Sequence, residues 1–311
     1  MSGVAPLDTG TKGRILIPFA LVTTIWGSTW LVIHSQFGPV STEWSVSYRF
    51  VVGALSMFVV ALAMRLPIKV RASDHALAAA LGLAIFGINY NAVYASELHT
   101  TSGLVAVIFS LLVPLNAIFA RIFLGQGLSR PFLLGSAVAM LGVVLLFVHE
   151  WRGIAHDPHE VTLGIGLALC AVFFASIGNV LQGSARARQV PMATLLAWAM
   201  SWGALLDAVA AWVRSGRPVF DLRLSYIAGL LYLGVIASAV AFTLYFNLIR
   251  RIGAARGGYV NVMIPVIAMG FSTVFEHYVW SIEAALGGLL VLIGLVLAMR
   301  ARGDTPVPRK G

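Results

Sequence analysis

The sequence is poor in charge, in acidic residues and in cysteine. Charged residues make up 11% of the 311 residues, and only 12 are Asp or Glu. A soluble domain carries about 25% charged residues, so a soluble fold of this length is excluded. The single cysteine excludes an intramolecular disulfide and a cysteine metal site. The net charge of +9 is spread thinly over the chain, and no basic run or stacking platform indicates a nucleic-acid partner.

Hydrophobic residues, in contrast, make up 59% of the chain. A helix needs about 20 mainly apolar residues to cross the hydrocarbon core of a bilayer. Turn and charge signals divide the chain into ten such stretches. The predicted spans are 15–34, 45–64, 76–96, 101–124, 131–149, 162–184, 191–213, 225–246, 254–275 and 282–300. The sequence therefore predicts an all-α membrane protein whose partners include the lipid bilayer.

The distribution of Lys and Arg predicts the orientation of these spans. With the N-terminus inside the cell, 16 of the 21 basic residues fall in cytoplasmic segments. Four fall in external loops, and Arg49 lies within the second span. Positive residues are enriched on the cytoplasmic side of membrane proteins, so both termini are expected to be cytoplasmic. The tails are then residues 1–14 and 301–311.

The two halves of the sequence resemble each other. The stretch "SLLVPLNAIFA" (110–120) matches "NVMIPVIAMGF" (261–271), which aligns Pro114 with Pro265. The fifth and tenth spans each contain two glycines seven residues apart, at 135 and 142 and at 287 and 294. Five helices is an odd number, so the second unit has the opposite orientation. The predicted units are 15–149 and 162–300, an inverted repeat of the kind that builds secondary transporters.

Polar and aromatic residues lie near the middle of several spans. Trp26 and Trp30 share one face of the first span, and Trp198 and Trp202 share one face of the seventh. These rings either pack between helices or line a cavity. We predict a substrate-binding set of Trp26, Ser28, Thr29, Asn89, Tyr90, Tyr94, Ser110, Asn179, Trp198, Trp202, Ser238, Tyr259 and Asn261. Pro114 and Pro265 each remove a helical hydrogen bond, and we predict a kink at both.

Charge inside the predicted spans is rare. Arg49 and Asp207 are candidates for an ion pair or for a coupling site, because ionisable residues inside a membrane are commonly functional. A purely structural pair is the alternative. No phosphate loop, zinc-protease motif or nucleophile constellation is recognisable, so no enzyme activity, cofactor or metal is expected.

Three stretches of the sequence match the pattern of a known family. They are "WGSTWLVIHSQFGPVSTEWSVSYRF" (26–50), "FLGQGLS" (123–129) after the proline-centred fourth span, and "VFEHYVWS" (274–281) at the end of the ninth. With these stretches the chain resembles the drug/metabolite transporter superfamily, as two tandem EamA-type units. This resemblance implies a ten-helix permease of the inner (plasma) membrane that exports amino acids or related metabolites through a central cavity. We expect the protein to be a monomer or a homodimer. The fifth and tenth helices would then be peripheral.

Three functional hypotheses follow from these features. The first is a permease for small amphipathic metabolites, most of all amino acids, that works by alternating access. The second is multidrug efflux of aromatic or cationic compounds, which four inner tryptophans favour and the shortage of deep acids disfavours. The third is a membrane scaffold or receptor that transports nothing.

Overall fold

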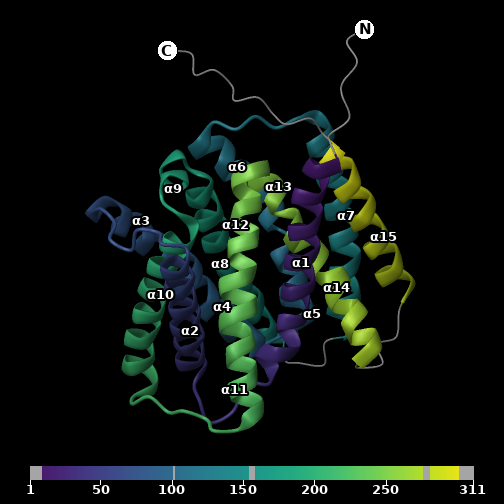
Figure 1. The fold of residues 1–311 in the computed structure, drawn as a ribbon. Coiled ribbons are helices and arrows are strands. Elements are labelled where there is room, and N and C mark those ends of the chain that lie inside the picture. The colour runs from purple at the N-terminus through teal and green to yellow at the C-terminus, as the bar shows by residue number, and fades with distance from the viewer. Residues whose placement is uncertain (1–8, 101, 154–157, 276–280, 301–311) are drawn as a thin grey trace.

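The computed structural model describes residues 9–100, 102–153, 158–275 and 281–300, and all regular structure in these ranges is helical (Figure 1). Residues 1–8 and 301–311 of the predicted tails and residues 276–280 of the "VFEHYVWS" motif lie outside the described residues. Residues 9–14 of the predicted N-terminal tail belong to the first helix of the structure. The first half contains α1 (Thr9–His34), α2 (Thr42–Ala63), α3 (Ala72–Leu81), the π-helix η1 (Gly82–Asn89), α4 (Tyr90–Glu97), α5 (Ser102–Phe109), α6 (Leu112–Leu124) and α7 (Arg130–Gly153). The second half contains α8 (Pro158–Gly183), α9 (Ala185–Gln189), α10 (Met192–Ser215), α11 (Leu224–Leu231), the π-helix η2 (Tyr232–Val240), α12 (Ala241–Ile252), α13 (Ala254–Gly257), α14 (Tyr259–Phe275) and α15 (Ile282–Arg300).

The fold is that of a membrane protein. Seven helical stretches within the described ranges are long and apolar enough to cross a bilayer. They are Thr42–Ala63, Ala72–Glu97, Leu104–Leu124, Arg130–Val148, His159–Gly183, Met192–Ser215 and Leu224–Ile252. Large apolar side chains cover the outside of the bundle, for example Leu55, Val59 and Leu134, each more than 60% exposed. An apolar outer surface of this kind needs lipid, not water, around it.

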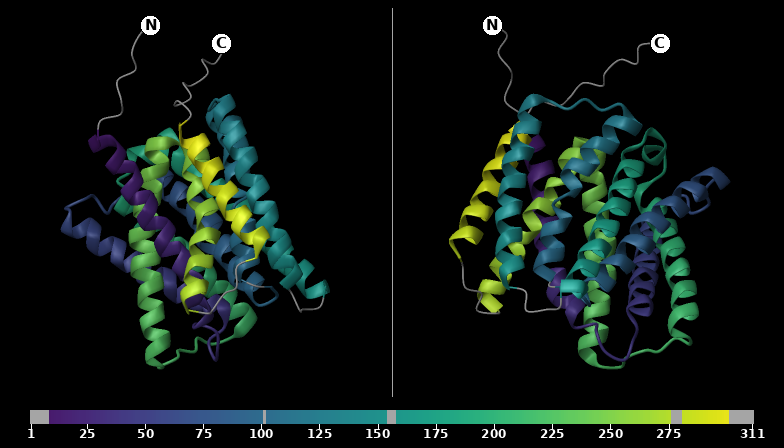
Figure 2. Two further views of the ribbon diagram at one scale, coloured as in Figure 1. Left: turned by 90° about the vertical axis from the view of Figure 1, so that its right-hand side faces the viewer. Right: turned by 180° about the vertical axis from the view of Figure 1, so that it is seen from behind.

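The two halves exchange their first helices. The helix α1 packs on α12 and α14 of the second half, and α8 packs on η1, α4 and α6 of the first half. The second helices of the two halves, α2 and α10, pack against each other, and α7 packs against α15 along one side of the bundle (Figures 1 and 2). The contacts of α1 in one half thus have counterparts in those of α8 in the other.

A π-helix interrupts the third long helix of each half. The π-helices η1 and η2 begin at residues 82 and 232, and η1 packs on α10 as η2 packs on α2. Gly82 permits the close approach, because a Cβ there would lie 2.5 Å from the carbonyl oxygen of Ala199. Wider π-turns of this kind occur often at functional sites. The pattern of hydrophobic residues in the sequence did not predict either π-helix.

The aligned prolines do not act alike. Pro114 lies in the first turn of α6, and the chain between α5 and α6 leaves the helix at Ser110 and Leu111. A proline has no N–H and its ring crowds the preceding turn, which accounts for this break. Pro265 lies inside α14, which continues from Tyr259 to Phe275, and the chain breaks earlier, between α13 and α14.

The four glycines of the repeated pattern bring α7 and α15 together. A Cβ on Gly142 would lie 2.5 Å from the carbonyl oxygen of Gly287, and a Cβ on Gly294 would overlap the backbone nitrogen of Ala139. Small residues allow two helix backbones to approach closely inside a membrane. The seven-residue spacing therefore reflects helix packing at this interface.

Gly294→Ala is expected to destabilise the protein, because a methyl group would force the two backbones apart. Overpacking of this kind costs about 1–3 kcal/mol, which corresponds to a melting temperature lower by about 2–12 °C. Gly288→Ala is the matched control on the same helix, since a Cβ there meets no atom within 4 Å. Thermal unfolding of both variants in detergent tests the interface, and equal melting temperatures would contradict it.

Candidate functional site

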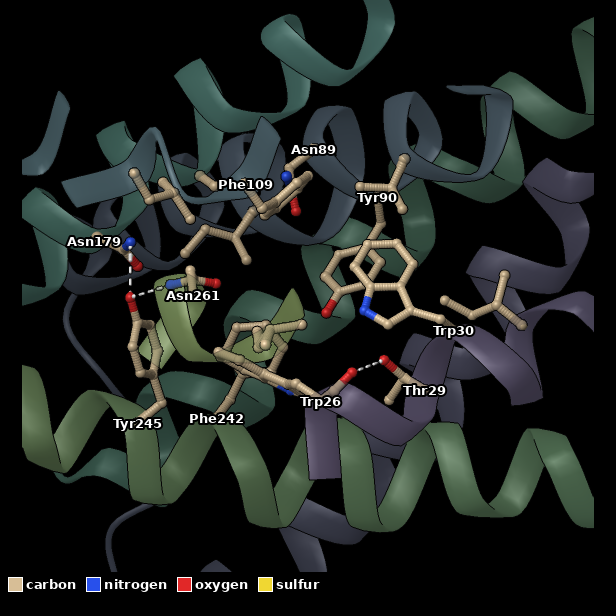
Figure 3. Close-up of a pocket in the computed structure, with 16 residues that line it drawn as sticks. Trp26, Thr29, Trp30, Asn89, Tyr90, Phe109, Asn179, Phe242, Tyr245 and Asn261 are labelled. Carbon is tan, nitrogen blue, oxygen red and sulfur yellow. Dashed lines mark hydrogen bonds between the residues drawn. The ribbon is translucent and has the colours of Figure 1, made fainter. Parts of the chain in front are cut away.

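A central cavity lies between the two halves of the protein, where α1, η1, α4, α5, α6, α8, α12 and α14 meet (Figure 3). Its volume is about 70 Å³. The lining residues are Trp26, Thr29, Trp30, Ile33, Ile85, Asn89, Tyr90, Val93, Phe109, Leu112, Ala175, Asn179, Phe242, Tyr245, Asn261 and Ile264. This volume is well below the roughly 300 Å³ of a typical small-molecule pocket.

Aromatic rings form much of the cavity wall. The indole of Trp26 lies edge-on to the rings of Phe242 and Tyr245, with centroids 5.0 and 4.8 Å away. Its N–H donates to the carbonyl oxygen of Ala237 at 3.0 Å, which fixes the ring to the second half. The buried indole N–H of Trp30 has no hydrogen-bond partner among the described residues. Trp26 is therefore held in place, whereas Trp30 offers an unused donor.

A network of amides and one tyrosine joins four helices at the side of the cavity where Asn179 lies (Figure 3). The hydroxyl oxygen of Tyr245 accepts from the side-chain N–H groups of Asn179 at 3.0 Å and of Asn261 at 3.4 Å. Asn179 also donates to Asn116 at 3.4 Å, and Asn116 donates to the carbonyl oxygen of Ala254 at 3.1 Å. All four side chains are buried. The network ties both halves together beside the cavity.

A buried cation lies directly behind the cavity wall. Arg49 is 1% exposed, and its guanidinium carbon lies 4.4 Å from the centre of the Tyr90 ring. Its Nε donates to the hydroxyl of Ser238 at 3.0 Å, and its Nη2 donates to the hydroxyl oxygen of Tyr90 at 3.4 Å. The Tyr90 hydroxyl therefore connects the cavity with a fixed positive charge.

Six of the predicted binding residues line this cavity. They are Trp26, Thr29, Asn89, Tyr90, Asn179 and Asn261. The amide of Asn89 also donates to the carbonyl oxygen of Ala171 at 2.8 Å, so this side chain has a fixed orientation. The structure brings these residues together from four segments that are far apart in the sequence, namely α1, the junction of η1 and α4, α8 and α14.

Seven other predicted residues do not line the cavity. Ser28 shares a hydrogen bond of 2.6 Å with Tyr232, and Tyr259 shares one of 2.7 Å with Ser136. Ser238 contacts Arg49. The remaining four are Tyr94, which packs against Phe37, Ser110 at the break between α5 and α6, Trp202 beside Gly82, and Trp198.

Trp198 lies in a different part of the molecule. Its indole N–H donates to the carbonyl oxygen of Ile68 at 2.9 Å. Its ring lies edge-on to His75, with centroids 4.5 Å apart. The i, i+4 spacing puts Trp198 and Trp202 on one face of α10. It does not predict which residues this face contacts.

Arg49 and Asp207 do not form an ion pair with each other. Asp207 accepts from the side-chain N–H of Asn91 at 2.6 Å, while Arg49 contacts Ser238 and Tyr90. Similar depth in the membrane was the only argument for pairing them, and each side chain has other partners.

Ten of the 16 lining residues were absent from the predicted set, among them the aromatic residues Trp30, Phe109, Phe242 and Tyr245. Phe109 and Phe242 have no polar atom that marks them in a sequence of apolar runs. Tyr245 is a buried tyrosine close to the middle of a span, and a buried hydroxyl needs hydrogen-bond partners. The need of this hydroxyl for partners could have predicted that Tyr245 lies beside polar residues such as asparagines.

The helical bundle, the apolar outer surface and the central cavity define a polytopic membrane transporter as the class of protein. The EamA-like transporter family matches residues 13–148 and again residues 162–300, so the chain belongs to this family and is a transporter, not an enzyme.

Similar proteins include transporters of amino-acid compounds by name. The "Probable amino-acid metabolite efflux pump" of Escherichia coli is 21% identical, over 89% of this chain and 92% of its own. The "Probable terminal-alkyne amino-acid exporter" of Streptantibioticus cattleyicolor is 24% identical, over 91% and 93%. A protein of known crystal structure has the same fold, with a TM-score of 0.76 and 18% identity over 92% of this chain and 96% of its own.

Proposed function

We propose that this protein is a permease that exports small amphipathic metabolites, amino acids above all, by alternating access through the central cavity. The observation that carries this proposal is the cavity itself, which lies between the two halves and combines aromatic walls with buried polar groups. Transporters built from repeats bind substrate near the middle of the membrane at the interface between the repeats.

The polarity of the cavity favours an amino acid over an organic cation. None of its 16 lining residues is acidic, and Arg49 supplies positive charge behind Tyr90. The indole N–H of Trp30 and the hydroxyl of Tyr90 suit a carboxylate, since both are hydrogen-bond donors. Amide oxygens of the lining asparagines suit an ammonium group. The names of the two relatives support the same substrate class.

Transport requires that the cavity widen. A binding pocket for a small molecule has a volume of roughly 300 Å³ or more, against about 70 Å³ here. We infer that the described conformation is a closed one, in which the network around Tyr245 holds α6, α8, α12 and α14 together. The break next to Pro114 and the proline within α14 are the points at which these helices bend.

The architecture we propose is ten transmembrane helices in two inverted units, 15–149 and 162–300, with both termini cytoplasmic. The exchange of α1 and α8, and the π-helix in each half, support two equivalent units. The helix α1 begins and α15 ends at the same end of the bundle, as an even number of crossings requires (Figure 1). The proposed location is the inner (plasma) membrane, with the protein as a monomer or homodimer.

Cysteine labelling tests the orientation. In a Cys170→Ala background, a membrane-impermeant thiol reagent added outside intact cells is expected to label His156→Cys but not Arg188→Cys. The reason is that the basic residues concentrate on the side that contains position 188. Permeabilised cells provide the control, in which both positions react. Labelling of position 188 alone in intact cells would show that the orientation is the opposite of the proposed one.

Counterflow into liposomes tests the function. Liposomes that contain purified protein and a high internal concentration of unlabelled substrate are expected to accumulate labelled amino acids from the outside. Organic cations such as tetraphenylphosphonium are expected not to exchange. Exchange of the cations alone would establish multidrug efflux instead, and exchange of neither class would favour a scaffold or receptor.

A further inference from the structure

A second cavity lies apart from the central one, between α2, η1, α4, α8 and α10. Its volume is about 450 Å³. Glu43 near the start of α2 and Arg214 near the end of α10 stand at one end of it, and Asp207 lines its interior. Most of its remaining wall is apolar, for example Leu83, Leu167 and Leu206.

Two buried oxygen atoms in this cavity lack partners. The Oδ1 atom of Asp207 accepts from Asn91 at 2.6 Å, but its Oδ2 atom has no hydrogen-bond partner among the described residues. The side-chain oxygen of Asn91 has none either, while its N–H group also donates to the carbonyl oxygen of Gly87 at 3.0 Å. A buried acceptor without a donor destabilises the protein, because the group has lost its water and gained no partner. Two adjacent ones indicate a ligand that brings donors.

No basic side chain of the cavity neutralises Asp207. Arg214, the basic residue of the lining, lies two helical turns further along α10 and forms an ion pair with Glu43 at 3.8 Å. Asp207 itself is 1% exposed. A carboxylate buried in a low-dielectric environment requires a cation beside it or else takes up a proton.

We propose that this second cavity binds the ammonium group of a small amphipathic amine, with Asp207 and Asn91 as its acceptors. A metal ion would need about six oxygen ligands, and the cavity supplies too few beside its apolar wall. An alkylammonium ion needs only two or three acceptors, and its hydrocarbon part fits against Leu83, Leu167 and Leu206. The same ammonium chemistry is available from a free amine or from the headgroup of phosphatidylethanolamine.

The occupied site would act on the helix that also forms the central cavity. Gly87 and Asn91 face the second cavity, whereas Asn89 and Tyr90, their neighbours in η1 and α4, face the central one. The amine therefore contacts the π-helical segment from its other side. This site goes beyond the transport proposal, since it uses residues that the central cavity does not.

The probe for the test is 3-methylbutylammonium, and calorimetry on the purified full chain in detergent is the measurement. We expect the amine to bind, and the uncharged 3-methylbutanol and the anionic 3-methylbutanoate not to bind. Asp207→Asn is expected to weaken binding at least tenfold. Asp221→Asn is the matched control, because Asp221 lies outside the cavity and contacts Arg223 at 2.5 Å, and it is expected to bind within twofold of wild type.

A second variant separates loss of the site from loss of the fold. Ala210→Leu fills the cavity three residues beyond Asp207 and keeps the carboxylate, so it is expected to abolish binding with a melting temperature near wild type. Undiminished binding by Asp207→Asn, equal binding of amine and alcohol, or no binding by wild type would each overturn the proposal.

In nanodiscs, weaker amine binding with phosphatidylethanolamine than with phosphatidylcholine would identify the lipid headgroup as an occupant, and equal binding would identify free amines. Amino-acid counterflow in liposomes is a separate readout, so either proposal can fail alone.

Discussion

Trp26→Ala is expected to reduce amino-acid counterflow at least tenfold per folded protein. The indole forms one wall of the central cavity and holds the rings of Phe242 and Tyr245 in place from the edge. Its removal takes away the apolar surface against which a substrate side chain would pack, and a tenfold loss corresponds to about 1.4 kcal/mol. The substitution also lowers stability, since truncation of a buried tryptophan costs about 3–5 kcal/mol. Rates must therefore be normalised to monodisperse protein.

Trp198→Ala is the matched control for this experiment. It makes the same truncation at a tryptophan whose contacts are Ile68, His75 and Phe58, outside the cavity. Transport by this variant is expected to stay within twofold of wild type. Trp26→Phe, which retains a ring but loses the hydrogen bond to Ala237, is expected to give an intermediate rate. If folded Trp26→Ala protein transported at the wild-type rate, the indole would serve only to pack the helices together.

Tyr245→Phe is expected to destabilise the closed conformation and to accelerate exchange at least fivefold. The change removes one oxygen atom and leaves the amide N–H groups of Asn179 and Asn261 without that acceptor. Each buried donor without a partner costs about 1–3 kcal/mol. The melting temperature in detergent is expected to fall by several degrees, and counterflow reports the opening of the cavity.

Tyr48→Phe is the control for the loss of a hydroxyl. That hydroxyl donates to the carbonyl oxygen of Val219 at an exposed position, so water replaces the lost partner. Stability and exchange are expected to match wild type. If Tyr245→Phe behaved in the same way as Tyr48→Phe, the network would have no part in closing the cavity.

The sequence correctly predicted an all-helical membrane protein because the signal for a membrane helix is local. About twenty apolar residues between charged turns specify such a helix whatever surrounds it, and seven helical stretches of the described residues are long and apolar enough to cross a bilayer. The spacing of the glycines in α7 and α15 was also a readable signal, and the structure shows that these residues pack against each other. The π-helices were not predictable, because a single extra residue per turn leaves no mark in an apolar run.

The cavity was predictable only in part. The spacing of Trp26 and Trp30 and the mid-span positions of Asn89 and Tyr90 pointed to residues that do line the cavity. The direction in which each face points depends on how the helices pack, which a single sequence does not contain. Trp198 and Trp202 therefore lie elsewhere, and Arg49 approaches Tyr90 rather than Asp207.

Access to a cysteine inside the central cavity tests alternating access most directly. Thr29→Cys in a Cys170→Ala background changes a lining residue whose hydroxyl only donates to its own helix, to the carbonyl oxygen of Trp26 at 2.7 Å. An impermeant thiol reagent is expected to label this cysteine in right-side-out and in inside-out vesicles, and a transported amino acid is expected to slow both reactions. Labelling from one side only, or no effect of substrate from either side, would contradict a cavity that opens alternately to the two sides of the membrane.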